Sequence, residues 1–204
     1  MTQSGHSTAG FTLCGFDWMQ RLPLDQYWAQ TGPLWIDLGA GKGGFLAAVA
    51  QAFPDYRFLG VERQLDRVRR IDRRLVRLGL RNVRLLRAEN DYTVRWLLPA
   101  ASVDGFFILF PDPWPKKRHH KKRLITKPFL DALYRALKPG GIVDFATDHR
   151  PYSEWARDLW DAHPGFVRHE PGPTHMRVAE TDFERLWRAQ ELPIHRLAYR
   201  AEAM

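Results

Sequence analysis

The sequence predicts an α/β protein with a doubly wound, mostly parallel sheet and helices on both faces. Three observations support this fold class. Short apolar runs alternate along the chain with segments whose apolar residues recur at helical spacing. A glycine-rich turn follows the first apolar run. The chain has 204 residues, 45% of them hydrophobic, which suits one domain with a sizeable core.

The first half of the chain contains three predicted strands and two predicted helices. The first strand spans residues 34–38 and runs into a turn containing Gly39, Gly41 and Gly43. A helix over residues 45–53 and a strand over residues 57–61 complete a βαβ unit. A second helix closes at Gly79, before a strand over residues 83–86. Its predicted buried stripe is Leu65, Val68, Ile71, Leu75 and Leu78.

The second half continues the alternation. We predict a strand over residues 104–110, a helix over 129–137 and a strand over 142–146. A helix with Trp155, Leu159 and Trp160 follows, and then two strand candidates, 166–170 and 194–200, flank a polar segment. The pattern predicts six or seven strands, with the ligand site outside the carboxyl ends of the parallel strands.

The chain is expected to form one domain over residues 21–204, preceded by a mobile tail over residues 1–20. Its apolar runs, such as residues 106–110, are far shorter than the ~20 residues of a membrane span, and no secretory signal is evident. The single cysteine, Cys14, excludes an intrachain disulfide and leaves no zinc motif. We therefore expect a cytoplasmic protein without a metal site or a membrane partner, and the sequence leaves monomer and homodimer open.

The glycine-rich turn and the acids near it predict a nucleotide-like cofactor. Glycines let the backbone approach a ligand closely, and Glu62 follows the second strand, where dinucleotide folds place an acid on the ribose. NAD and S-adenosylmethionine both fit this pattern. Asp37 favours the latter, because a carboxylate beside the turn suits a ligand with an ammonium group and a sulfonium. The candidate cofactor-binding residues are Asp37, Gly39, Ala40, Gly41, Glu62, Arg63, Glu89 and Asn90.

The fourth strand runs into Phe110-Pro111-Asp112-Pro113-Trp114-Pro115, in which prolines flank the acid. The prolines exclude regular helix and sheet, so Asp112 is expected on a rigid turn at the mouth of the fold. Such rigidity suits a reaction site, and Trp114 could stack on a base. The alternative is a proline-rich connection in which Asp112 is a cap.

The formal charge of +8 is concentrated directly after this turn. Six of the eight residues 116–123 are Lys or Arg. A basic run joined to a rigid turn is better explained by phosphate contacts than by a solvated surface, so nucleic acid is the expected partner. A second basic set lies opposite the apolar stripe of the second helix, where a solvated face is at least as plausible: Arg63, Arg67, Arg70, Arg74 and Arg77.

These motifs stand in one order with Gly140-Gly141, Ala146-Thr147-Asp148 and Thr181-Asp182-Phe183-Glu184. Over residues 34–200 the chain resembles the bacterial tRNA (guanine-N7)-methyltransferases. The resemblance implies a seven-stranded class I methyltransferase fold, S-adenosylmethionine as methyl donor, and N7 of a variable-loop guanine in tRNA as acceptor. The sequence departs from the family's usual pattern at Asp37, Glu89, Pro115 and Leu186-Trp187.

Carried over residue by residue, the resemblance assigns cofactor acids to Asp37, Glu62, Glu89 and Asp112. It implies substrate contacts at Lys116, Asp148, Thr181, Asp182, Phe183 and Glu184. It implies RNA contacts along the basic run, where the candidates are Lys117, Arg118, His119, His120, Lys121, Lys122 and Arg123. Guanine N7 already has a free lone pair, so catalysis can be mainly alignment and electrostatics, with Asp112 as the candidate catalytic residue.

Three other functions remain open from the sequence. The first is a methyltransferase that acts on another RNA, a protein or a small molecule, although a small acceptor has no use for six adjacent cations. The second is a nicotinamide oxidoreductase, for which Asp37 would lie badly beside a pyrophosphate. The third is a non-catalytic RNA-binding protein on the same fold.

Overall fold

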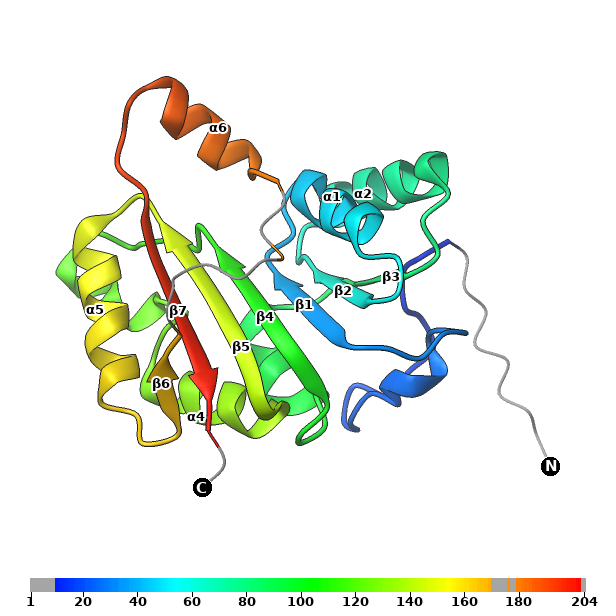
Figure 1. Cartoon of the computed structure of the whole chain (residues 1–204), viewed down its shortest axis with the longest axis horizontal. Helices are drawn as coiled ribbons and strands as arrows, with labels where there is room; N and C mark the ends of the chain where they lie inside the picture. Colours follow the sequence, from blue (N-terminus) through cyan, green and yellow to red (C-terminus); the bar gives the residue numbers. More distant parts are fainter. Residues whose placement is uncertain (1–9, 170–175, 177–178, 203–204) are drawn as a thin grey trace.

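The computed structural model describes residues 10–169, 176 and 179–202. It is built on a seven-stranded sheet with the order β3-β2-β1-β4-β5-β7-β6. The first five strands pair in parallel, whereas β7 is antiparallel to both β5 and β6 (Figure 1). The strands are β1 Leu34–Leu38, β2 Arg57–Val61, β3 Val83–Leu86, β4 Val103–Leu109, β5 Leu137–Thr147, β6 Phe166–Arg168 and β7 His195–Ala201.

Helices cover both faces of the sheet, which confirms the predicted fold class (Figure 1). Alternate β1 residues belong to different apolar clusters, because side chains alternate across a strand. Trp35 packs in the cluster that includes residues of α1 and α2, whereas Leu34 and Ile36 pack in the cluster that includes residues of α4 and α5. The main helices are α1 Gly44–Ala52, α2 Leu65–Leu78, α4 Lys127–Ala136, α5 Arg150–Asp161 and α6 Asp182–Ala189.

The buried stripe of α2 is shorter than the sequence predicts. Val68, Ile71 and Leu75 are buried, but the two end positions, Leu65 and Leu78, are 37% and 40% exposed. The helix is longer than the strands on which it packs. A 14-residue helix is about 21 Å long, whereas strands of four or five residues span roughly 13 to 17 Å, so the strands are too short to cover both ends of α2.

Several short elements were not expected from the sequence. These are the 3₁₀ helices η1 Leu24–Gln26 and η3 Lys117–Lys122, the short helix α3 Asn90–Tyr92 and the π-helical turn η2 Thr93–Leu97. The helix α6 was also not predicted. It occupies part of the polar segment between the last two strands, and its N-terminal end points toward α1 (Figure 1).

The tail expected over residues 1–20 stays a prediction, because residues 1–9 lie outside the described residues. Within the described part of this segment, two residues do pack on the sheet. Thr12 forms a parallel bridge with Leu85 of β3, and Leu13 is buried. Within the described part of the chain, no helix combines the length and the apolar character needed to cross a membrane.

Candidate active site

The turn between β1 and α1 places three glycines in the left-handed region of φ. Gly39, Gly41 and Gly43 have φ values of +90°, +59° and +71°. Gly43 is constrained twice, since a Cβ there would also lie 2.7 Å from Cγ1 of Ile71 on α2. The glycine therefore permits both the sharp turn and the close packing of α1 on α2.

The same turn is hydrogen-bonded to the end of β2. The backbone N–H groups of Gly39 and Ala40 both donate to the carbonyl oxygen of Val61 at 2.9 Å. The N–H of Gly41 donates to the carboxylate of Glu62 at 3.1 Å. The structure thus brings the predicted cofactor residues of the turn together with the predicted ribose acid.

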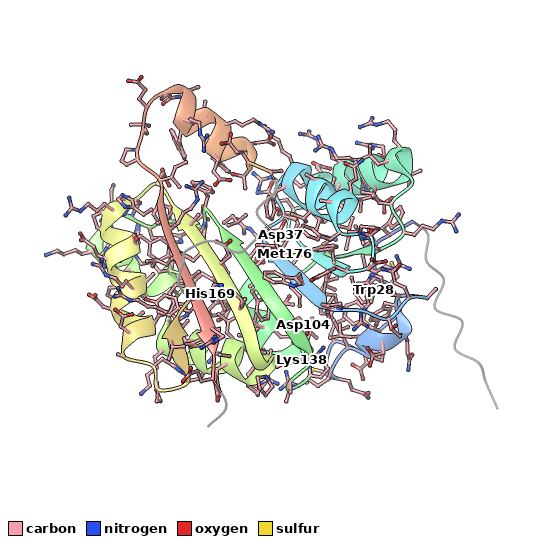
Figure 2. All side chains as sticks on the ribbon, in the orientation of Figure 1. Trp28, Asp37, Asp104, Lys138, His169 and Met176 are labelled. Atoms are coloured by element: carbon pink, nitrogen blue, oxygen red, sulfur yellow. The ribbon has the colours of Figure 1, made fainter. Side chains whose placement is uncertain are left out.

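Asp37 lies beside this turn at the carboxyl end of β1 and is only 4% exposed (Figure 2). Burial raises the pKa of Asp37 to about 7, and the negative charge of Glu62 acts in the same direction. Glu62 is also buried, but its carboxylate accepts hydrogen bonds from the N–H groups of Gly41 and Gln64. A bound cation would therefore favour ionised Asp37, which fits a ligand that carries an ammonium or a sulfonium.

The end of β3 contributes Glu89 and Asn90. Glu89 is the N-cap residue of α3, and its exposed carboxylate lies 3.6 Å from the guanidinium of Arg63. Asn90 lies against the glycine turn, since a Cβ placed on Gly39 would be 3.5 Å from the Asn90 amide nitrogen. All three predicted residues thus follow the carboxyl ends of β2 and β3. Arg63 comes directly after Glu62, which forms an acid pair with Asp37 at this edge of the sheet.

The Asp112 turn follows β4, the neighbour of β1 in the sheet. Two of its residues that are not glycine, Phe110 and Trp114, have φ values of +54° and +42°. Such backbone angles cost of order 1–3 kcal/mol each and persist only where surrounding contacts hold them. The N–H of Phe110 donates to the carbonyl oxygen of Ala146 on β5, and Asp112 is exposed on the turn. The Asp112 turn is therefore present at the expected edge of the sheet, and its rigidity stays a prediction.

The basic segment, residues 116–123, folds back on the Asp112 turn. Lys122 Nζ lies 4.7 Å from the centre of the Trp114 ring, and the His119 ring contacts the same indole edge-on. His120 packs against Trp155 of α5. The cationic side chains that remain exposed are those of Lys116, Lys117, Arg118, Lys121 and Lys122.

Arg123 differs from the rest of the basic segment, because it is only 4% exposed. Its Nε donates to the carbonyl oxygen of Pro113 at 2.9 Å. Its guanidinium carbon lies 5.0 Å and 5.2 Å from the ring centres of Tyr152 and Trp155. The predicted RNA contact at Arg123 conflicts with this burial, since the guanidinium faces protein groups, and we leave the residue out of the RNA surface.

Asp148 follows β5 directly and is half-buried. Because Leu109 of β4 pairs with Ala146 of β5, the residues that follow the two strands emerge side by side. Asp112 and Asp148 are therefore carried by adjacent loops. This is the arrangement required if both acids are to face one substrate.

The segment Thr181–Glu184 forms the N-terminus of α6. The Thr181 hydroxyl accepts from the Glu184 N–H at 3.0 Å, and the Glu184 carboxylate accepts from the Thr181 N–H at 2.7 Å. This is a capping box, and the T-x-x-E spacing in the sequence could have predicted the helix start. Glu184 is 1% exposed and is also paired with Arg196 of β7 at 2.6 Å.

Two contacts bring this end of α6 to the site. The rings of Phe183 and Phe110 stack with centres 5.9 Å apart, which links α6 to the Asp112 turn. A Cβ on Gly44, the first residue of α1, would lie 3.8 Å from a carboxylate oxygen of Asp182. The predicted substrate segment thus lies close to both the glycine turn and the Asp112 turn.

Comparisons with known proteins agree with this arrangement. Residues 31–197 match a family model described as "Putative methyltransferase". A tRNA (guanine-N(7)-)-methyltransferase of Halorhodospira halophila is 36% identical over 184 residues, which cover 88% of this chain and 79% of that protein. The chain belongs to the tRNA (guanine-N7)-methyltransferase family. A member from Pseudomonas aeruginosa is 33% identical over 89% of this chain and 70% of its own length.

Not all family members match over their full length. The one from Thermotoga maritima is 34% identical over 172 residues, and the matched region covers 83% of this chain but only 55% of that protein. This chain therefore spans about half the length of several curated family members that it matches.

Solved structures support the fold assigned to the family. The 16S rRNA methyltransferase KamB superimposes with a TM-score of 0.66 at 17% identity, covering 88% of this chain and 93% of that one. The aminoglycoside resistance methyltransferase NpmB1 gives 0.64 at 22% identity, covering 94% and 97%. Within the described residues, no group of three or more His, Cys, Asp or Glu side chains is arranged to hold a metal ion.

Proposed function

We propose that this chain transfers a methyl group from S-adenosylmethionine to N7 of a guanine in the variable loop of tRNA. The proposal rests on two features that lie at the carboxyl ends of the neighbouring strands β1 and β4. The first is the acid pair beside the glycine turn, and the second is the basic segment that packs on the Asp112 turn. The acid pair suits a cationic cofactor, and the basic segment suits a polyanion.

The cofactor would be held by the residues around the glycine turn. Asp37 and Glu62 supply the buried carboxylates, while Asn90 and the exposed pair Arg63 and Glu89 border the same turn. We assign Asp37 to the cationic part of the cofactor, because a positive charge there opposes the effect of burial on its pKa. Glu62, already held by two backbone N–H groups, is assigned to the ribose hydroxyls.

The substrate would be oriented by acids from two adjacent loops. When bound, S-adenosylmethionine supplies a methyl group on a sulfonium, and guanine N7 needs no prior loss of a proton to accept it. Asp112 and Asp148 orient the guanine through its N1–H and exocyclic amine and stabilise the positive charge that develops on the purine. Thr181, Asp182 and Phe183 approach the base from α6, and Glu184 holds that segment in place.

The tRNA would be bound by the exposed cations of the basic segment. Lys116 follows the Asp112 turn directly and is assigned to the nucleotide that carries the target base. Lys117, Arg118, Lys121 and Lys122 are exposed on η3 or at its ends and are assigned to phosphates of the tRNA. The two histidines His119 and His120, half-buried against Trp114 and Trp155, are assigned to shaping this surface. Because tRNA is the proposed substrate, we also infer a cytoplasmic location.

The test is nucleoside mass spectrometry of unmodified tRNA after incubation with the protein and S-adenosylmethionine. We expect 7-methylguanosine, and no product from a tRNA whose variable-loop guanine is replaced by adenine. Methylation of another nucleoside would show that the protein is an RNA methyltransferase but would overturn guanine N7 as its acceptor. Binding of tRNA without methylation, and without affinity for S-adenosylmethionine, would identify a non-catalytic RNA-binding protein instead.

A further inference from the structure

Arg123 ends the basic segment but joins two loops of the protein. Its Nε donates to the carbonyl oxygen of Pro113, the residue directly after Asp112, at 2.9 Å. Its guanidinium lies over the rings of Tyr152 and Trp155, both on α5. One buried side chain therefore connects the turn after β4 to the helix after β5.

Neighbouring contacts reinforce this connection. The indole N–H of Trp155 donates to the carbonyl oxygen of Ile125 at 3.0 Å, and the N–H of Ile125 donates to the hydroxyl of Tyr152 at 3.2 Å. Tyr152 is fully buried. Burial raises the pKa of Tyr152 to about 12, although the hydrogen bond from the Ile125 N–H and the positive charge of Arg123 act in the opposite direction.

The Asp112 turn depends on such external contacts. Pro111, Pro113 and Pro115 have no backbone N–H, so the turn can form few hydrogen bonds of its own. Phe110 and Trp114 are held in a backbone conformation that non-glycine residues disfavour. The hydrogen bond from Arg123 reaches the centre of this stretch, at Pro113.

We propose that Arg123 is a positioning residue, which holds Asp112 in a fixed place relative to Asp148, the residue between β5 and the N-cap of α5. The proposal rests on the proposed function only for the role of the two acids. An arginine suits this position because its planar guanidinium can stack between two aromatic rings while one N–H donates in the plane. A lysine could keep the charge near the rings but has no planar group to stack.

The kinetic test compares Arg123→Gln with Arg200→Gln, which removes the same charge from an exposed position on β7, away from the site. Misplacing a catalytic group by about 1 Å costs of order 100-fold in rate, so we expect Arg123→Gln to lower kcat by about that factor without changing KM for S-adenosylmethionine. Arg200→Gln should leave kcat and both KM values unchanged. Arg123→Lys should restore part of kcat.

A second measurement does not depend on methyl transfer. The segment offers trypsin several sites between Lys116 and Lys122, and Arg123 holds its C-terminal end. Under native conditions, Arg123→Gln should be cleaved there at least about ten times faster than Arg200→Gln, which keeps every trypsin site of this stretch, with circular dichroism showing that both variants are folded. If Arg123→Gln fails to fold, Trp155→Phe, which removes the indole N–H and shrinks the ring under the Arg123 guanidinium, takes its place.

The outcomes separate the two proposals. If the wild-type protein methylates no tRNA but the two variants show the expected difference in cleavage, the proposed function is overturned and the connection made by Arg123 is supported. Normal kcat together with unchanged cleavage in Arg123→Gln would overturn the positioning role. Faster cleavage with normal kcat would reduce Arg123 to a structural residue, which also overturns it.

Discussion

The fold strongly changes the ionisation of Asp37. An unfolded aspartate has a pKa near 3.9, whereas burial raises the pKa of Asp37 to about 7 in the folded protein. Between these two values the folded state holds a proton that the unfolded state has lost. The contribution of Asp37 to stability is thus fully present below about pH 4 and is lost as the pH rises through 7.

Replacing Asp37 should raise the stability of the folded protein but abolish its affinity for S-adenosylmethionine. Each unit of pKa difference corresponds to about 1.4 kcal/mol, so Asp37→Asn should be more stable than the wild type at pH 8, by a margin that shrinks at pH 5. Urea denaturation of the free proteins at both pH values measures this margin. Calorimetry should show that Asp37→Asn has lost its affinity for S-adenosylmethionine.

The control for Asp37 is Asp55→Asn, the same exchange at an exposed position. It should leave both stability and affinity unchanged. A margin for Asp37→Asn that is equal at pH 5 and pH 8 would show that Asp37 ionises like an ordinary aspartate, and the assignment to a cationic ligand would lose its main support.

Replacing Asp112 should lower the rate of methyl transfer but not the free energy of unfolding. It is exposed on its turn, so Asp112→Ala should leave the free energy of unfolding nearly unchanged. Loss of a group that stabilises developing charge costs about 100- to 1,000-fold in kcat, and we expect a loss of that order in single-turnover methylation of tRNA. Asp158→Ala, at an exposed position on α5, is the control. Near-normal turnover of Asp112→Ala would remove the residue from the mechanism.

Among the elements, α6 depends most on its end contacts. Of the side chains of this helix, only Glu184 is buried, so packing alone holds it weakly. Its capping box supplies two hydrogen bonds at the N-terminus, and the Glu184 pair with Arg196 ties it to β7. The stacking of Phe183 on Phe110 therefore depends on a helix start that is fixed by Thr181.

Thr181→Ala should loosen this helix start. Removal of an N-cap side chain costs about 1 kcal/mol, which corresponds to a roughly five-fold loss of amide exchange protection in α6. Hydrogen exchange read by mass spectrometry measures this change. Thr126→Ala is a matched control, because Thr126 is the N-cap residue of α4 but forms no side-chain capping bond. Equal effects of the two substitutions would contradict a special role for the capping box.

The elements differ in how closely the sequence predicts them, and the reasons are physical. The bounds of β1, β2 and α2 were predicted closely, because buried strands and an amphipathic helix have strong periodicity. Helix α6 was missed, since a helix with one buried residue has no apolar stripe. Arg123 was grouped with the other cations of its segment, because only its tertiary contacts with Pro113 and α5 set it apart.

Over the whole molecule, the net charge of +8 is unevenly distributed: acids gather at the cofactor site, and six Lys or Arg residues gather in the basic segment. We expect tRNA affinity to fall steeply with salt. Replacing Lys116, Lys117, Lys121 and Lys122 by Ala should flatten the log–log slope by about one for each phosphate that is no longer neutralised. Filter binding across a salt series measures the slope.

The control for the salt series is Arg200→Ala. Arg200 pairs in register with Ile142, the first β5 residue that pairs with β7, and lies away from the carboxyl end of β5, so the slope should not change. An unchanged slope in the fourfold Lys variant would exclude the basic segment as the RNA surface. The exposed arginines of α2 would then be the next surface to test.

The position of β7 between β5 and β6 has a consequence for folding during synthesis. β6 pairs only with β7 in the described sheet, and β5 pairs with β7 over six residues. The ribosome makes β7 after both of these strands, so the edge of β5 stays open until β7 has emerged. We therefore expect the nascent chain to form its β3-β2-β1-β4-β5 half first and to need protection of that open edge, for example by a chaperone, until β7 is inserted.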